Sequence, residues 1–284
     1  MKIKSIFLVF LFSLSVFAQQ NERDREWNKP VEPFKIIGNV YYIGASEITS
    51  FLITSPKGHI LIDGGFAETA PQIKENIVRL GFKLKDVKIL LNTQAHYDHA
   101  AGLAELKRAT RAKMLISAED KILLENGGKN DFAFGDEYSY EPVKADKVIT
   151  DGEIIKLGNI SLKTIFTPGH TKGCTSFWLE VKENGKIYNV IFVGSTTAPG
   201  YQLVGNEKYP NIIADYEKTF SLMKKLDPDV FLASHGNFFD LLGKIEKLKQ
   251  NQSSNPFIDS QSYKDFLTST EKDFWEKIKN QEKK

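Results

Sequence analysis

The sequence has a single cysteine, Cys174, among 284 residues, so the chain cannot form an internal disulfide. A lone thiol can act as a nucleophile or a zinc ligand. In the strand-like run that begins at Cys174 and continues Thr-Ser-Phe-Trp, however, it is more often a small buried side chain. The stability of the fold must therefore come from a hydrophobic core and from any bound metal.

An excess of charge of either sign is also lacking. The sequence has 38 basic and 36 acidic side chains, for a formal net charge of +2. This balance provides no strong electrostatic field that would attract nucleic acid or an anionic membrane. With 41% hydrophobic and 26% charged residues, the composition is ordinary for a globular protein. We therefore expect a small-molecule substrate and no nucleic-acid partner; the sequence does not set the oligomeric state.

Long apolar runs are confined to the N-terminus, where Lys2 and Lys4 precede an apolar stretch from Ile6 to Ala18. This pattern is typical of a signal peptide, residues 1–18, cleaved after Ala18. The stretch is too short to span a bilayer comfortably, which makes an uncleaved anchor the weaker alternative. The residue directly after the cleavage site is Gln19, not a cysteine that could carry a lipid. We expect export to the periplasm, without a membrane anchor after cleavage.

No low-complexity linker interrupts residues 19–284, which predicts a single domain. β-Branched and aromatic runs predict strands at 34–42, 49–53, 59–62, 88–92, 114–116, 154–157, 160–166, 175–181, 188–193 and 230–233. Helical periodicity and stop signals predict helices at about 69–80, 102–110, 118–125, 212–226, 241–249 and 263–279. The alternation indicates an α/β protein. This alternation of strands and helices fits two sheets packed face to face with helices outside, although periodicity alone does not exclude other α/β arrangements.

The sequence contains five histidines, and all except His59 follow a predicted strand closely. Their placement is the main indication of function. Gln94, His96, Asp98 and His99 lie in one short segment after the strand that ends near residue 92, whereas His170 and His235 follow two later strands. Zinc prefers imidazole nitrogen and carboxylate oxygen, and a catalytic ion keeps one position open for water. Each histidine alone is more often a surface or core residue, but together they predict two metal sites.

The short segment can serve two ions if it is extended. Alternate side chains of an extended loop point to opposite sides, so Gln94, His96 and Asp98 would share a face while His99 turns to a second ion. Asp63, in a glycine turn after a strand, is expected to hydrogen-bond the ligand loops, with a plain turn aspartate as the alternative. Trp27, Phe34 and Tyr201 could line an apolar cleft, but aromatic residues of this kind are more often core.

These motifs resemble the metallo-β-lactamase superfamily. The resemblance rests on Asp98-His99, Thr-Pro-Gly-His170, Ser-His235 and Ile-Asp63-Gly-Gly, and it covers roughly Phe34 to Phe239. The family's usual first motif is His-x-His-x-Asp-His, and here Gln94 replaces its first histidine. The resemblance implies a four-layer αββα sandwich with metal loops along one edge of the paired sheets.

The resemblance also implies ligand sets and a substrate. A first zinc would be held by Gln94, His96 and His170, and a second, bound more tightly, by Asp98, His99 and His235. The run that starts at Ser195 resembles the third subclass of class B β-lactamases, in which hydroxyl groups help to hold the substrate carboxylate. Those groups would be Ser195 and Thr197 here, where ordinary turn hydroxyls are the alternative.

Relatives that hydrolyse thioesters, lactones or RNA carry an aspartate that bridges both metals, in a Gly-Asp pair after a strand. This chain has Gly194-Ser195 at that place. The expected reaction is therefore hydrolysis of the β-lactam amide of antibiotics by metal-activated water or hydroxide, with Asp98 as the catalytic residue that orients the water. One or two zinc ions would suffice. The alternatives are a lactonase or thioester hydrolase of the same fold, and a non-catalytic zinc-binding relative.

Overall fold

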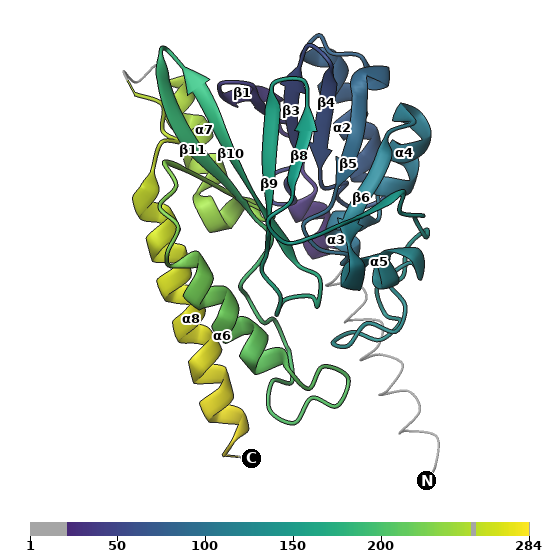
Figure 1. Cartoon of the computed structure of the whole chain (residues 1–284), viewed down its shortest axis with the longest axis vertical. Helices are drawn as coiled ribbons and strands as arrows, with labels where there is room; N and C mark the ends of the chain where they lie inside the picture. Colours follow the sequence, from purple (N-terminus) through teal and green to yellow (C-terminus); the bar gives the residue numbers. More distant parts are fainter. Residues whose placement is uncertain (1–21, 251–253, 284) are drawn as a thin grey trace.

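A computed structural model describes residues 22–250 and 254–283 of the chain (Figure 1). The predicted signal peptide, residues 1–18, lies outside the described residues. No helix in the described part of the chain is long and apolar enough to cross a membrane.

The first half of the chain forms a seven-stranded sheet in the order β1 to β7. Its strands are β1 (Phe34–Ile37), β2 (Val40–Tyr42), β3 (Phe51–Ser55), β4 (Gly58–Ile62), β5 (Val87–Leu91), β6 (Lys113–Ser117) and β7 (Lys147–Ile149). Pairing is antiparallel from β1 to β4 and parallel from β4 to β7. The predicted strand at 34–42 is divided by Gly38, whose φ of +54° suits a tight turn. The short β7 was not expected from the sequence.

The second half forms a five-stranded sheet in the order β12-β11-β10-β9-β8. Its strands are β8 (Ile154–Leu157), β9 (Ile160–Phe166), β10 (Thr175–Glu183), β11 (Lys186–Val193) and β12 (Val230–Ala233). Consecutive strands from β8 to β11 pair antiparallel, and β12 returns parallel to β11 after a helical crossover. This crossover places the ends of β11 and β12 beside each other.

Helices cover the outer face of each sheet (Figure 1). Beside the first sheet lie α2 (Thr69–Arg79), α4 (Leu103–Thr110) and α5 (Ala118–Glu125). Beside the second lie α6 (Ile212–Met223), α7 (Leu241–Lys249) and α8 (Ser260–Gln281). The remaining helical turns are η1 (Leu84–Asp86), α3 (Tyr97–Ala100), η2 (Gly236–Phe239) and residues 22–27.

The core has separate layers that match this architecture. Phe51 and Ile62 of the first sheet belong to the same buried cluster as Phe177 and Phe192 of the second. A different cluster packs the outer face of the first sheet against α2 and α4. Burial of apolar side chains at roughly 25 cal/mol per Å² makes these layers the main source of stability in a chain without a disulfide. The predicted αββα sandwich is confirmed.

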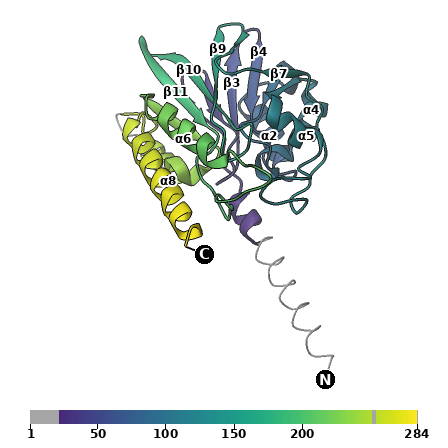
Figure 2. The same cartoon turned by 60° about the horizontal axis from the view of Figure 1, so that its bottom comes forward.

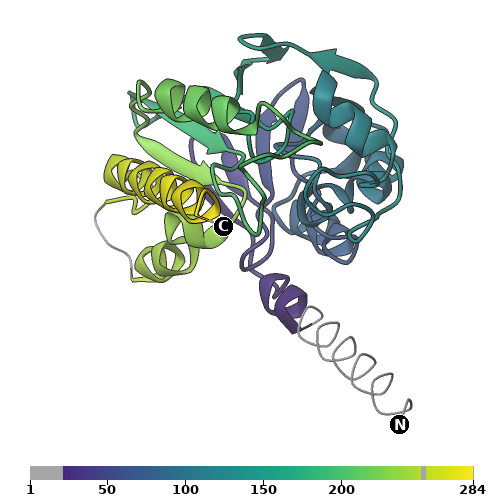
Figure 3. The same ribbon diagram turned by 90° about the horizontal axis from the view of Figure 1, so that it is seen from below.

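The loops that follow β5, β9, β11 and β12 lie at one end of the paired sheets, the lower end in Figure 1, which faces the viewer in Figure 3. The helical residues 22–27 also lie at this end (Figures 2 and 3). Polar side chains from segments far apart in the sequence therefore meet there.

Candidate metal centre

Six side chains with metal-binding nitrogen or oxygen atoms gather at the lower end of the sheets. They come from the segment between β5 and α4 and from the loops after β9 and β12: Gln94, His96, Asp98, His99, His170 and His235. We name two clusters after the ligand sets that the family resemblance implies: the first is Gln94, His96 and His170, and the second is Asp98, His99 and His235. The structure brings His96 and His170 into contact, and it gathers Asp98, His99 and His235 at one point. The Gln94 side-chain amide nitrogen lies 3.5 Å from the Ser234 hydroxyl.

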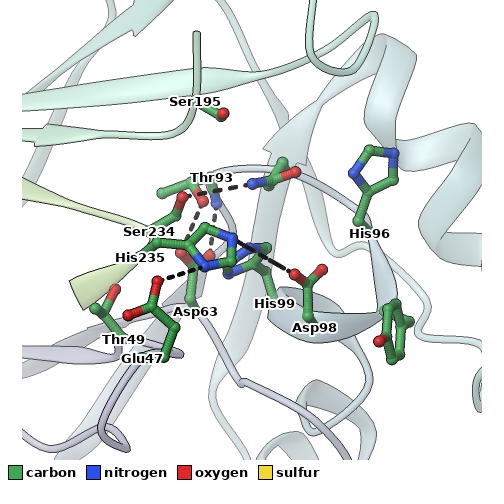
Figure 4. Close-up of polar contacts among 12 residues, drawn as sticks. Glu47, Thr49, Asp63, Thr93, His96, Asp98, His99, Ser195, Ser234 and His235 are labelled. Atoms are coloured by element: carbon green, nitrogen blue, oxygen red, sulfur yellow. Dashed lines mark hydrogen bonds and ion pairs between the residues drawn. The ribbon is translucent and has the colours of Figure 1, made fainter. Parts of the chain in front are cut away.

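The second cluster brings three ligand atoms to one point. His99 Nε2 lies 3.3 Å from His235 Nε2. Asp98 Oδ2 lies 3.4 Å from His99 Nε2 and 3.6 Å from His235 Nε2. Two imidazole nitrogens on a tetrahedral zinc, each at about 2.0–2.1 Å, would be about 3.3–3.4 Å apart. The spacing therefore fits zinc, and Figure 4 shows the His235 ring and the Asp98 carboxylate directed at each other.

The carboxyl group of Asp98 is held in its ionised form. Burial alone would raise the pKa of Asp98, but the charge and hydrogen bond of His99, with the charge of His235, hold that pKa well below its usual range. An ionised carboxylate is the form that ligates a cation and accepts a hydrogen bond from water.

The first cluster has the same spacing between its imidazoles. His96 Nδ1 lies 3.2 Å from His170 Nε2. Gln94 is fully buried, and its Oε1 has no hydrogen-bond partner among the described residues. A buried acceptor without a partner is costly unless something satisfies it, and a cation at this position would do so. The spacing of His96 and His170 thus fits a metal as well, and the unpaired amide oxygen of Gln94 is the third donor that the family resemblance implies.

Contacts on the far side of the His170 ring fix which nitrogen carries its proton. Nδ1 of His170 lies 2.8 Å from the Thr197 carbonyl oxygen, which also accepts a hydrogen bond from the Tyr216 hydroxyl. Because a carbonyl only accepts, Nδ1 must donate, and Nε2 is left with its lone pair toward His96. Burial and the charge of His96 lower the pKa of His170 well below its ordinary value, which keeps the ring neutral. A neutral ring is the form that binds zinc.

Two buried aspartates hold the ligand loops in place. The Asp63 carboxylate accepts hydrogen bonds from the Thr93 amide and hydroxyl and from the Asn92 side chain, as expected for a residue that supports the loop. The Asp120 carboxylate accepts from the Ala95 amide and from the Thr171 hydroxyl. Asp120 therefore ties the loop after β5 to the loop after β9.

The sequence did not identify Asp120, because it lies in the first turn of α5, outside every motif. An aspartate at that place is ordinary for a helix, where acidic residues favour the N-terminus. Only its contacts reveal that it supports the first cluster.

The alternation expected for an extended loop does not hold. His96 is extended, but residues 97–100 form the single helical turn α3. Asp98 and His99 are therefore brought together with His235 in the second cluster. This grouping agrees with the second of the two ligand sets implied by the family resemblance.

Both clusters open into one cavity of about 500 Å³. Its aromatic lining includes Trp27, Tyr97, Phe134, Tyr138 and Phe238. Of the three aromatic residues considered from the sequence, only Trp27 lines this cavity: Phe34 stacks on Tyr42, and the Tyr201 hydroxyl donates to the His170 carbonyl. The cavity is therefore apolar on its walls and polar at its floor, the usual character of a small-molecule site.

The two expected substrate-binding hydroxyls differ in position. Thr197 lines the cavity, but Ser195 is 1% exposed and is not a lining residue. The Ser195 hydroxyl lies 3.0 Å from that of Thr197. Figure 4 shows Ser195 set apart from the second cluster. The Thr197 side chain can therefore contact a ligand in the cavity directly, whereas Ser195 lies behind Thr197.

Cys174 lies outside both clusters, as expected for a small buried residue. Burial raises the pKa of its thiol to about 12, and its Sγ lies 3.8 Å from the Ser195 carbonyl oxygen. Gly194 packs so closely that a β-carbon there would come within 2.6 Å of this sulfur. The Cys174 side chain thus packs against the turn after β11, and its buried thiol is not available as a metal ligand.

Replacing Gln94 by histidine is expected to raise the zinc affinity of the first cluster by about 10-fold or more, because an imidazole nitrogen is a stronger donor to zinc than an amide oxygen. In the parent protein, the first cluster should bind zinc more weakly than the second. Dialysis against graded free zinc, with the bound ions counted, measures both. Gln202→His, at an exposed position, is the control for an added histidine. Equal affinity at the two clusters of the parent protein would contradict the prediction.

Comparison with known proteins agrees with this geometry. Residues 43–235 match the family described as "Metallo-beta-lactamase superfamily". The chain is 44% identical to the metallo-beta-lactamase GOB-18 of Elizabethkingia meningoseptica, with 90% of this chain and 95% of that chain covered and a TM-score of 0.84. It is 35% identical to BJP-1 of Bradyrhizobium japonicum, described as a subclass B3 metallo-beta-lactamase, with 90% and 97% covered and a TM-score of 0.85.

A curated relative of a different kind is also similar. The hydroxyacylglutathione hydrolase GloC of Haemophilus influenzae is 28% identical over 221 residues, which cover 75% of this chain and 93% of that protein. The comparisons confirm the resemblance inferred from the motifs. They also show that the chain is similar to hydrolases of two substrate classes.

Proposed function

The chain belongs to the metallo-β-lactamase superfamily, and from this premise we propose that it hydrolyses the amide bond of β-lactam rings at a zinc centre held by the two clusters. The superfamily supplies metallo-hydrolases of several substrate classes, so the substrate must be argued from the site.

The observation that carries the proposal is the residue at the end of β11. Gly194-Ser195 occupies the place where the thioester and lactone hydrolases of the superfamily would have a bridging carboxylate. The Ser195 hydroxyl is turned to Thr197. The clusters therefore share no carboxylate from this turn, and Asp98 is the carboxylate in the second cluster. Likeness to GOB-18 and BJP-1 over nine-tenths of the chain supports the same substrate class.

The residues of the cavity suit this reaction. When bound, zinc would lower the pKa of a water molecule to about 7 and polarise the substrate carbonyl. Asp98 would accept a hydrogen bond from the attacking water and so orient it, because its carboxylate is ionised and lines the cavity. Thr197 would donate to the substrate carboxylate, and the aromatic walls would contact its apolar parts.

Thioester hydrolysis is the second candidate, because the relative GloC is similar over three-quarters of the chain. The test is to measure kcat/KM for a penicillin, a cephalosporin and a hydroxyacylglutathione thioester with one preparation of zinc-loaded protein. We expect the β-lactams to be turned over and the thioester to remain near the uncatalysed rate. Turnover of the thioester alone would replace the proposal by the second candidate.

Inhibitors that trap an acyl-enzyme, such as clavulanate, are expected to leave the activity intact. Ser195 is buried and its hydroxyl is hydrogen-bonded to that of Thr197, and no side chain in the described part of the chain is placed to activate it as a base. Dipicolinate should inactivate the protein by removing metal. Mass spectrometry of the protein after incubation with clavulanate checks the mechanism, and a stable adduct on Ser195 would overturn it.

We also propose that residues 1–18 direct export and that residues 19–284 are the mature single domain in the periplasm. The support is the basic start and short apolar stretch that ends at Ala18. The mass of protein recovered from the periplasmic fraction gives the cleavage position.

A further inference from the structure

A partly buried carboxylate lies behind one histidine of the second cluster. Glu47 Oε1 is 3.3 Å from Nδ1 of His235, on the side of the ring away from Asp98 (Figure 4). The other oxygen of Glu47 accepts a hydrogen bond from the Asn237 amide, and its backbone carbonyl accepts from the Gly236 amide. Glu47 is thus fastened to the same stretch of chain that carries His235.

A second carboxylate, which is buried, occupies the matching place in the first cluster. Asp131 Oδ2 is 3.4 Å from Nε2 of His96, the nitrogen that does not face His170. The other oxygen of Asp131 accepts from the amides of Ala133 and Phe134, which fixes the carboxylate in its turn. The carboxylate is therefore held behind the ring, at ion-pair distance from the nitrogen that does not face His170.

The other two histidines have no such partner. His170 donates to a backbone carbonyl, and no carboxylate in the described part of the chain makes an ion-pair contact with His99 Nδ1, whereas Glu47 and Asp131 make such contacts with His235 and His96. Each cluster therefore has one histidine with an anionic group behind its ring. Glu47 and Asp131 lie 84 positions apart in the sequence and in no common motif, so their matching placement follows from the fold.

We propose that Glu47 and Asp131 are positioning residues, one for each metal position: Glu47 acts on the second through His235, and Asp131 acts on the first through His96. The inference rests on the ligand sets of the proposed function. A carboxylate at the far nitrogen holds the proton there, so the near nitrogen presents its lone pair to the metal and the ring keeps one orientation. Loss of such a partner costs about 10-fold to 100-fold in metal affinity.

The variants Glu47→Gln and Asp131→Asn test the proposal. Both retain an amide oxygen that can accept the backbone hydrogen bonds of Asn237, Ala133 and Phe134, so the local turns are preserved while the negative charge is lost. Zinc affinity is measured by competition with a chromophoric chelator, which does not depend on turnover of any substrate. A failure of the β-lactam proposal would therefore leave this measurement unaffected.

Each position is measured in a background that disables the other. His170→Ala leaves the second position; there, Glu47→Gln should weaken zinc binding by about 10-fold to 100-fold, and Asp131→Asn by less than about 2-fold. His99→Ala combined with Gln94→His leaves a first position that binds zinc strongly enough to measure. In that background, Asp131→Asn should weaken zinc binding by about 10-fold to 100-fold and Glu47→Gln by less than about 2-fold. Equal losses in both backgrounds would indicate a general structural role and would overturn the proposal. So would less than about a 2-fold change from each variant at its own position.

Thermal melting of the metal-free proteins is the second measurement. A positioning role predicts that the melting temperatures of the metal-free variants and their backgrounds agree within about 2 °C, because the backbone contacts remain. A much larger decrease in the metal-free state, with no difference between positions, would contradict it.

Discussion

Replacement of Asp98 by alanine should lower kcat for β-lactam hydrolysis by at least about 100-fold, the lower bound for removing a group that positions a reacting proton. Asp98 Oδ2 faces both His99 and His235, so the change removes one of the three ligands of the second cluster. It also removes the ionised carboxylate that would orient the attacking water. The loss should appear in kcat at saturating substrate, measured with zinc in excess.

The matched control is Asp227→Ala, since the Asp227 side chain is 78% exposed and pairs with Lys264 far along the chain. This variant should retain the activity of the parent protein. If purified Asp98→Ala protein hydrolysed β-lactams within a few-fold of the parent, the role of Asp98 would be wrong.

Metal removal should lower the free energy of unfolding by about 4 kcal/mol relative to protein in free zinc at 1,000 times its Kd. The melting temperature should fall by about 8–16 °C, at roughly 2–4 °C per kcal/mol for a domain near this size. The physical reason is that the native clusters bind the ion and the unfolded chain lacks the assembled site. No internal disulfide is available to offset the loss.

Calorimetry of protein dialysed against dipicolinate, then returned to zinc, measures this effect. The double variant Asp98→Ala and His170→Ala is the control, because it lacks a ligand from each cluster and should show a much smaller difference. An unchanged melting temperature in the parent protein would contradict the assignment of the clusters as metal sites.

The sequence predicted the helices and strands of the layers well because their periodic apolar segments are long and are bounded by clear turn residues. The helix at 69–80 and the strands at 160–166 and 175–181 all appear within a few residues of their expected bounds. The single turn α3 was missed because four residues carry no periodicity. That turn brings Asp98 and His99 together, so the local argument from alternation failed, although the second ligand set implied by the resemblance matched the geometry.

The supporting carboxylates could not be found in the same way. Glu47 lies in a loop before β3, Asp120 opens a helix and Asp131 lies in an irregular turn, and each is a common residue at such a place. Their roles depend on contacts with residues 188, 51 and 35 positions away in the sequence: Glu47 with His235, Asp120 with Thr171 and Asp131 with His96. Histidines stand out because they are rare in this chain, whereas single acidic residues among 36 do not.

The most direct measurement of the central claim is hydrolysis of a carbapenem by the purified protein, followed by loss of the ring absorbance, with zinc and with a chelator. We expect steady loss of absorbance with zinc, no loss above the uncatalysed rate with the chelator, and recovery when zinc is returned. Absence of turnover in protein shown to contain bound zinc would contradict it, as would turnover that the chelator leaves unchanged.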